Sequence, residues 1–133
     1  MNINDITGKI IGCAMNVHNF LGNGFQEVIY QRALAIELNA TGLNFHRELE
    51  MPIMYKCEQI GTRRVDFYVE DCVMVELKAV EKILDVHKSQ AINYLEAYCI
   101  ADGLLINFGG TSLEFKRLYN KRLVNPSNPI NPN

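Results

Sequence analysis

The segment Arg63–Ile83, RRVDFYVEDCVMVELKAVEKI, alternates apolar and polar residues on both sides of a short acidic turn. Apolar side chains stand at every second position over 65–69 and again over 73–77. This is the pattern of two strands that each bury one face, so the segment predicts a β-hairpin. The other face carries Asp66, Glu76 and Lys78 within otherwise good strand sequence, and these charges need an explanation.

The apolar faces of the two strands coincide in only a few registers. The tightest register has a loop of Glu70–Cys72, pairs Phe67 with Val75 and places Asp66 directly opposite Glu76. Carboxylates in such positions are about 5 Å apart, and at an effective dielectric constant of about 20 they repel by about 3 kcal/mol. A bound divalent cation, or a proton on one acid, would offset that repulsion.

A longer register moves the loop to Glu70–Met74 and sets Asp66 opposite Lys78, which forms an ordinary ion pair. Register alone does not decide between a metal site and an ion pair. In both registers Asp66, Glu76 and Lys78 share one face, because Lys78 follows Glu76 by two residues on the same strand.

The composition is that of one globular domain with a real core. The chain has 133 residues, of which 48% are hydrophobic and 21% are charged. A formal net charge of −2 argues against a strongly basic surface but leaves room for a local basic groove. We see no apolar run long enough to span a membrane and no secretory signal. The four cysteines form no CxxC pair, and we expect them to be reduced in a cytoplasmic protein.

Periodicity along the chain predicts helices over about 4–20, 25–39 and 85–100. Besides the hairpin, strands are expected at 44–49, 53–56, 103–108 and 113–118. The order ααββββαββ predicts an α+β or α/β fold in which helices flank a mixed central sheet. We expect residues 1–124 to form a single domain, and 125–133, rich in Pro and Asn, to form a disordered tail.

Two further features lie on helices. Glu27 lies in the first turn of the second predicted helix, where an acid is usually a favourable partner for the helix dipole. The helix that follows the hairpin carries His87, Gln90 and Tyr94 along one stripe, a spacing that is often only core and rim. Its first turns also hold Lys88, and helix N-termini favour anions such as phosphate.

These pieces together resemble a known pattern. Asp66 followed by Glu76-Leu77-Lys78 resembles the D…(D/E)xK core of the PD-(D/E)XK nuclease superfamily. The upstream Glu27 and the downstream QxxxY of Gln90–Tyr94 resemble its RecB-like branch, and GFQEVIY at 24–30 is similar to the signature of the GxxExxY family. The similarity extends from about Ile6 to Leu118, although Val65 replaces the proline that often precedes the aspartate.

The resemblance implies a restriction-endonuclease-like core and a nuclease that uses Mg²⁺ or Mn²⁺ to hydrolyse nucleic acid, with DNA favoured over RNA. It implies metal ligands at Glu27, Asp66, Glu76 and the Leu77 carbonyl, with Lys78 as a catalytic residue beside the three acids. It further implies substrate contacts from Gln90, Tyr94, His87, Lys88 and Arg64, with Arg63 and Lys82 as nearby basic residues.

Two alternatives stay open at this point. The first is a catalytically silent nuclease fold that binds nucleic acid or a protein partner. The second is a structural subunit whose charged face is a buried ion-pair network. A chain of this size has little surface for sequence recognition, so a homodimer or a separate protein partner is a further expectation.

Overall fold

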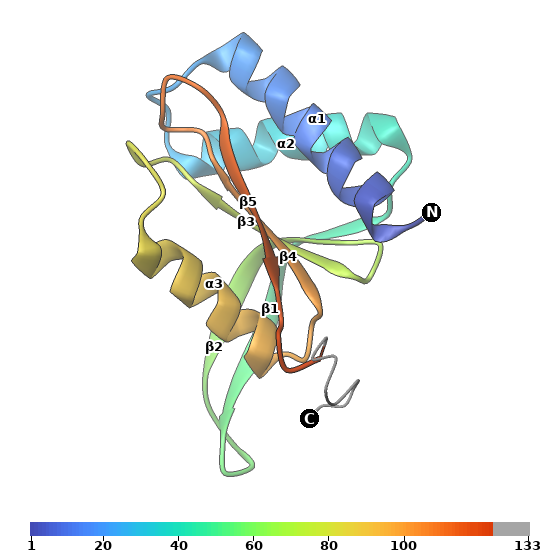
Figure 1. Cartoon of the computed structure of the whole chain (residues 1–133), viewed down its shortest axis with the longest axis vertical. Helices are drawn as coiled ribbons and strands as arrows, with labels where there is room; N and C mark the ends of the chain where they lie inside the picture. Colours follow the sequence, from blue (N-terminus) through green and yellow to red (C-terminus); the bar gives the residue numbers. More distant parts are fainter. Residues whose placement is uncertain (124–133) are drawn as a thin grey trace.

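A mixed five-stranded sheet forms the centre of the molecule in the computed structural model, which describes residues 1–123 (Figure 1). In chain order the elements are α1 (Ile3–Leu21), α2 (Glu27–Thr41), β1 (Phe45–Tyr55), β2 (Glu58–Val69), β3 (Val73–Lys78), α3 (Asp85–Ala97), β4 (Asp102–Asn107) and β5 (Glu114–Tyr119). The strands lie in the order β1-β2-β3-β4-β5, with β3 and β4 parallel and the other neighbours antiparallel. The predicted α+β fold with a mixed central sheet is confirmed.

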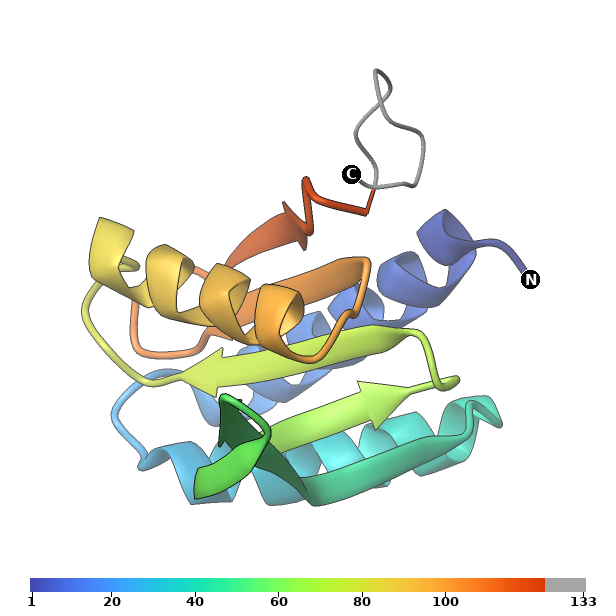
Figure 2. The same cartoon turned by 90° about the horizontal axis from the view of Figure 1, so that it is seen from below.

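Helices cover both faces of the sheet. Helices α1 and α2 pack on one face and bury residues such as Phe67 and Val75, whereas α3 packs on the other face against Met74 and Leu105 (Figure 1, Figure 2). A strand covered on both sides reads as a continuous apolar run. Five consecutive residues of β3, Val73–Leu77, are accordingly buried, and Glu76 is among them.

The β2–β3 hairpin adopts the tight register. Val69 pairs with Val73 and Phe67 with Val75, which leaves the predicted three-residue loop Glu70–Cys72. The longer register is therefore wrong. The ladder ends after Phe67, and beyond it the backbone N–H of Leu77 donates to the Asp66 carboxylate at 2.8 Å. The two strands thus separate at Asp66, and a side chain replaces the ladder there.

The apolar face of β2 is not continuous, contrary to the alternation in the sequence. Phe67 packs towards α1 and α2, whereas Val65 packs with Met74 in the cluster under α3. Between these two positions the ladder with β1 omits both Glu48, whose φ is 57°, and Asp66, so the register is unchanged. The Asp66 carboxylate accepts from the backbone N–H of Leu77 at this point, and here the face of β2 changes.

The two strands predicted at 44–49 and 53–56 are a single strand, β1, so the observed order is ααβββαββ. Pro52 lies inside this strand, opposite Thr62 of β2. Since β1 is at the edge of the sheet, a proline whose missing N–H would face outwards is tolerated there. Pro52 therefore does not interrupt the strand, although two strands on either side of it were predicted from the sequence.

Tyr30 fixes the start of α2. Its buried hydroxyl donates to the carbonyl of Gly22 at 2.6 Å and accepts from the backbone N–H of Phe25 at 3.2 Å. Its ring stacks on Phe108 at a centroid distance of 4.6 Å. The loop between α1 and α2, and with it Glu27 at the first position of α2, is therefore tied to the end of β4.

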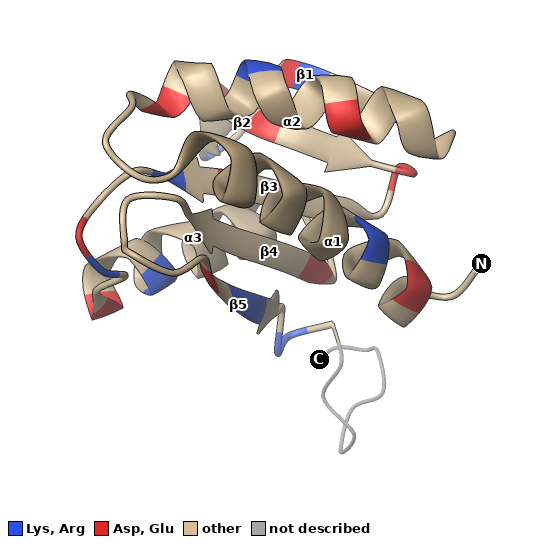
Figure 3. Ribbon diagram, turned by 90° about the horizontal axis from the view of Figure 1, so that it is seen from above, with Lys and Arg blue, Asp and Glu red and all other residues tan. Residues whose placement is uncertain are grey.

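The predicted tail, 125–133, lies outside the described residues. Within residues 1–123 no helix combines the length and the apolar character that a membrane crossing needs. All four cysteines are unpaired thiols. Acidic and basic residues alternate along α1 and α2 and do not gather by sign, in keeping with the small net charge (Figure 3).

Replacing Tyr30 by Phe should lower the free energy of unfolding by about 1–3 kcal/mol, because two backbone groups lose their buried partner. Urea denaturation would measure the change. Tyr119→Phe is the matched control, since Tyr119 is 50% exposed and its hydroxyl loss should change stability by less than about 0.5 kcal/mol. Equal losses in the two variants would contradict the role assigned to Tyr30.

Candidate active site

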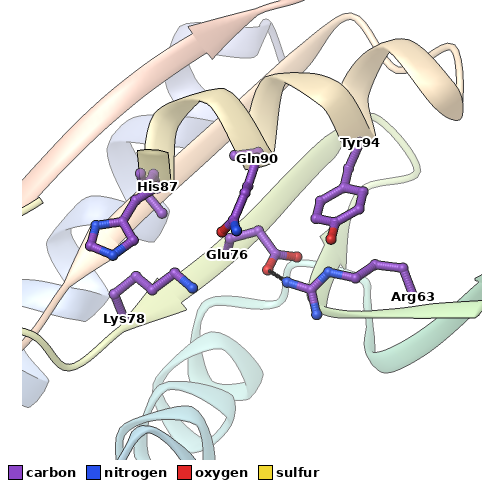
Figure 4. Close-up of a pocket in the computed structure, with 8 residues that line it drawn as sticks. Arg63, Glu76, Lys78, His87, Gln90 and Tyr94 are labelled. Atoms are coloured by element: carbon purple, nitrogen blue, oxygen red, sulfur yellow. Dashed lines mark hydrogen bonds and ion pairs between the residues drawn. The ribbon is translucent and has the colours of Figure 1, made fainter. Parts of the chain in front are cut away.

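A narrow polar pocket opens between α3 and the sheet, close to the point where β2 leaves β3. Figure 4 shows that Lys78 and Arg63 lie on opposite sides of Glu76, with side chains of α3 above them. The lining residues are Arg63, Glu76, Lys78, His87, Gln90, Ala91, Tyr94 and Leu105. The fold thus brings together five of the residues predicted for the site, two from β3 and three from α3.

Glu76 is the buried acid of this pocket. One carboxylate oxygen accepts from the Arg63 guanidinium at 2.5 Å, and the other is buried without a hydrogen-bond partner among the described residues. Burial, followed by the nearby charge of Asp66, raises the pKa of Glu76 from 4.5 to about 7, against the opposing charges of Arg63 and Lys78. The carboxyl therefore gains and loses its proton near neutral pH.

Asp66 is held from the opposite side of the sheet. Its Oδ1 accepts from the Gln31 side-chain amide of α2 at 2.8 Å, and its Oδ2 accepts from the backbone N–H of Leu77 at 2.8 Å. Its charge still contributes to the raised pKa of Glu76. The two acids are thus close enough to repel each other, as the tight register predicts.

Glu27 stands apart from this pair. It is exposed at the first position of α2, and within residues 1–123 no group of three or more His, Cys, Asp or Glu side chains is arranged to hold a metal. Gln31 follows Glu27 by one helical turn and so lies on the same face of α2. The predicted ligand set of Glu27, Asp66, Glu76 and Leu77 is therefore not assembled, although α2 does reach Asp66 through Gln31.

His87 presents one ring nitrogen to the pocket. Its Nδ1 lies 2.9 Å from the backbone N–H of Leu84 at the start of α3 and accepts from it. In the neutral imidazole the proton must then be on Nε2, which leaves a donor for the pocket. His87 was predicted to contact the substrate, and its second role as a cap of α3 was not visible in the sequence.

Two residues predicted to contact substrate lie outside the pocket. Arg64 pairs with Glu50 at 3.3 Å on the exposed surface of the β1–β2 hairpin. Lys88 pairs with Asp85 at 3.3 Å within the first turn of α3. The placement of Arg64 follows from the alternation of side chains along a strand. Arg63 and Arg64 point to opposite faces of β2, and only Arg63 lines the pocket.

Two contacts of the site were not predicted from the sequence. Gln31 is a buried polar residue among the apolar Tyr30, Leu34 and Leu38 of α2, and that mismatch in the sequence was a usable signal. The partnership of Arg63 with Glu76 had no such signal, because the residues are not paired in the sheet and meet only through side chains.

The site fits a cation at Glu76 and Asp66. A buried carboxylate oxygen without a partner is an acceptor that a ligand can satisfy. Burial, followed by the charge of Asp66, raises the pKa of Glu76, and a divalent cation beside the two acids would stabilise the buried carboxylate and relieve the repulsion. Hard cations such as Mg²⁺ prefer oxygen ligands of this kind.

A mixed sheet between helices, with two acids and a lysine where two strands separate, defines a restriction-endonuclease-like domain. The chain belongs to the PD-(D/E)XK nuclease superfamily, whose family model matches residues 4–118. Enzymes of this superfamily generally use divalent metals, which agrees with the acids found here.

One solved structure supports the fold. It is described as "Crystal structure of SSO0001" and superposes with a TM-score of 0.56 at 19% sequence identity. The match covers 68% of this chain and 48% of that protein, so the present chain spans about half of its length. No protein in the curated collection matches the chain.

Glu76→Gln should remove the pH dependence that Glu76 imposes on stability. With a folded-state pKa raised from 4.5 to about 7, Glu76 contributes stability that is fully present below about pH 4.5 and is lost as the pH rises through about 7. Between about pH 4.5 and pH 8 the wild type should lose about 3 kcal/mol relative to the variant.

Urea denaturation of both proteins across this pH range measures the difference directly. Asp5→Asn on α1 removes an exposed carboxyl and serves as the control. Parallel profiles for the wild type and Glu76→Gln would contradict the raised pKa.

Proposed function

We propose that the chain is a divalent-metal-dependent nuclease that hydrolyses phosphodiester bonds of nucleic acid, with DNA favoured over RNA. The observation that carries the proposal is the pair Asp66 and Glu76, which repel each other where β2 and β3 separate, beside Lys78. Membership of a nuclease superfamily supports the same conclusion.

In this proposal Asp66 and Glu76 hold Mg²⁺ or Mn²⁺, with the Leu77 carbonyl as a further oxygen. Glu27 joins them by turning its exposed side chain along the face of α2 that already carries Gln31. When bound, such an ion supplies Lewis-acid chemistry that polarises the phosphate and makes a water more acidic. Gln31 keeps the Asp66 carboxylate in place through its amide.

The remaining residues act on the substrate. Lys78 is partly exposed at the pocket and stabilises the negative charge that grows on the phosphate in the transition state. The Nε2–H of His87 and the amide of Gln90 donate to the nucleic-acid backbone from α3. Tyr94 contributes its ring, and Lys88 and Arg64 add positive charge outside the pocket.

A second candidate function is a nucleic-acid-binding or protein-binding module without hydrolysis. The observation that favours it is the ion pair of Arg63 and Glu76, which occupies one of the two carboxylates that a metal needs. Lys78 is retained in the pocket without an acidic partner within 4.0 Å among residues 1–123, which favours the active enzyme.

Several finer expectations belong to the same proposal. We infer membership of the GxxExxY family from the similarity of the GFQEVIY segment at 24–30 to its signature, and Tyr30 of this segment has the structural role described above. The proposal also includes a single nuclease domain over 1–124 and a homodimer or protein partner. It further includes a cytoplasmic location, which suits the four free thiols.

Asp66→Asn, Glu76→Gln and Lys78→Met should each lower the rate of DNA cleavage by at least about 100-fold, because each removes a group that acts on the reacting phosphate. The assay follows plasmid, linear duplex and single-stranded DNA in Mg²⁺ or Mn²⁺. Asp5→Asn, which removes an exposed acid of α1, is the control. Equal cleavage by the wild type and the three variants would reject these residues as catalytic.

Calorimetric titration with Mn²⁺ separates the two candidate functions. Asp66→Asn and Glu76→Gln should weaken Mn²⁺ binding at least about tenfold, the loss expected for one charged ligand. Glu27→Gln should weaken it less, by about threefold, because its side chain is exposed and flexible. DNA binding by a wild type that takes up no Mn²⁺ would favour the silent module.

A further inference from the structure

The ion pair of Arg63 and Glu76 is incompletely satisfied. Among residues 1–123, two buried side-chain polar atoms have no hydrogen-bond partner, and these are Nε of Arg63 and Oε2 of Glu76. The pair therefore holds one unused donor and one unused acceptor in the same pocket. Each unsatisfied buried group costs about 1–3 kcal/mol, so a pair with a purely structural role would be expected to satisfy both.

The guanidinium is nevertheless well positioned. It lies over the ring of Tyr94 at 4.7 Å from the centroid and donates from its other end to the carbonyl of Arg64 at 3.0 Å. The side chain of Arg63 is 31% exposed, whereas that of Glu76 is 4% exposed. Arg63 thus connects the buried acid to the open side of the pocket, with Tyr94 as a flat support.

The pocket is small while Arg63 and Glu76 are paired. Its free volume is about 10 Å³, which is space for about one water molecule. The two acids Asp66 and Glu76 are balanced by two cations, Arg63 and Lys78, when all four are ionised. A divalent cation bound at Glu76 adds positive charge beside Arg63, so the guanidinium is then repelled from its present position.

We propose that Arg63 is an exchangeable counter-ion and phosphate ligand: it neutralises Glu76 in the free protein, and it turns to a phosphate of the nucleic acid when a divalent cation takes the carboxylate. This inference rests on the proposed function. Guanidinium groups bind phosphate with two parallel hydrogen bonds, so the exchange gives the unused Nε–H a partner. Tyr94 supports the guanidinium in both positions.

The proposal predicts effects of opposite sign for one substitution. Arg63→Gln removes a cation that competes at Glu76, so Mn²⁺ measured by calorimetry without nucleic acid should bind about tenfold tighter. The same variant should bind a short labelled DNA duplex in Mn²⁺ about tenfold more weakly, and the slope of log affinity against log salt should fall by about 0.9. The DNA measurement uses a Lys78→Met background, which prevents cleavage.

Arg117→Gln is the charge-matched control. Arg117 is exposed on β5 at the other edge of the sheet and hydrogen-bonds Thr7 of α1, so both affinities should stay within about twofold. Arg63→Lys is a second test variant, which keeps the proposal testable if Arg63→Gln does not fold. It retains the charge and should leave Mn²⁺ affinity unchanged while DNA affinity falls, because the two-pronged contact is lost.

Weaker Mn²⁺ binding and weaker DNA binding together in Arg63→Gln would show that Arg63 only holds Glu76 in place, and would overturn the proposal. Unchanged Mn²⁺ and DNA affinities in Arg63→Gln would also overturn the proposal. If the wild type binds and cleaves DNA, that result leaves the proposed function intact. A wild type that binds no DNA would overturn the proposed function itself, and the phosphate half of this inference with it.

Discussion

The burial of one carboxylate inside a strand covered on both faces shapes the rest of this structure. Glu76 is 3% exposed between α3 and the other strands, in a run of five buried residues. A charge in such a place needs compensation, and the chain provides only part of it through Arg63. The raised pKa of Glu76 and its carboxylate oxygen without a hydrogen-bond partner both result from this incomplete compensation.

The second acid is held by a different layer of the molecule. Asp66 is fixed by Gln31 of α2 and by the backbone of Leu77. Helices on opposite faces of the sheet therefore each reach one of the two acids, since α2 binds Asp66 and α3 lines the pocket around Glu76. The two acids lie where β2 leaves β3 after Phe67.

The sequence predicted those parts that local periodicity controls, and less of what depends on packing. Alternation in the hairpin limited its register to a few possibilities, since a slip by one residue would expose an apolar face, and the tightest of them is the one observed. The unbroken course of β1 through Pro52 depends on its edge position, which no local pattern reveals. The approach of Arg63 to Glu76 takes place through side chains that are not paired in the sheet and was equally invisible in the sequence.

The hairpin of β1 and β2 extends well past the rest of the sheet (Figure 1). Of the twelve residues of β2 only Phe67–Val69 pair with β3, so Arg63 lies on a two-stranded arm. Hydrogen bonding of Tyr98 to Met51 and stacking of Tyr94 on Arg63 join this arm to α3. The arm begins where β2 leaves β3 at Asp66, so the contacts of Met51 and Arg63 with Tyr98 and Tyr94 help to hold it against the rest of the molecule.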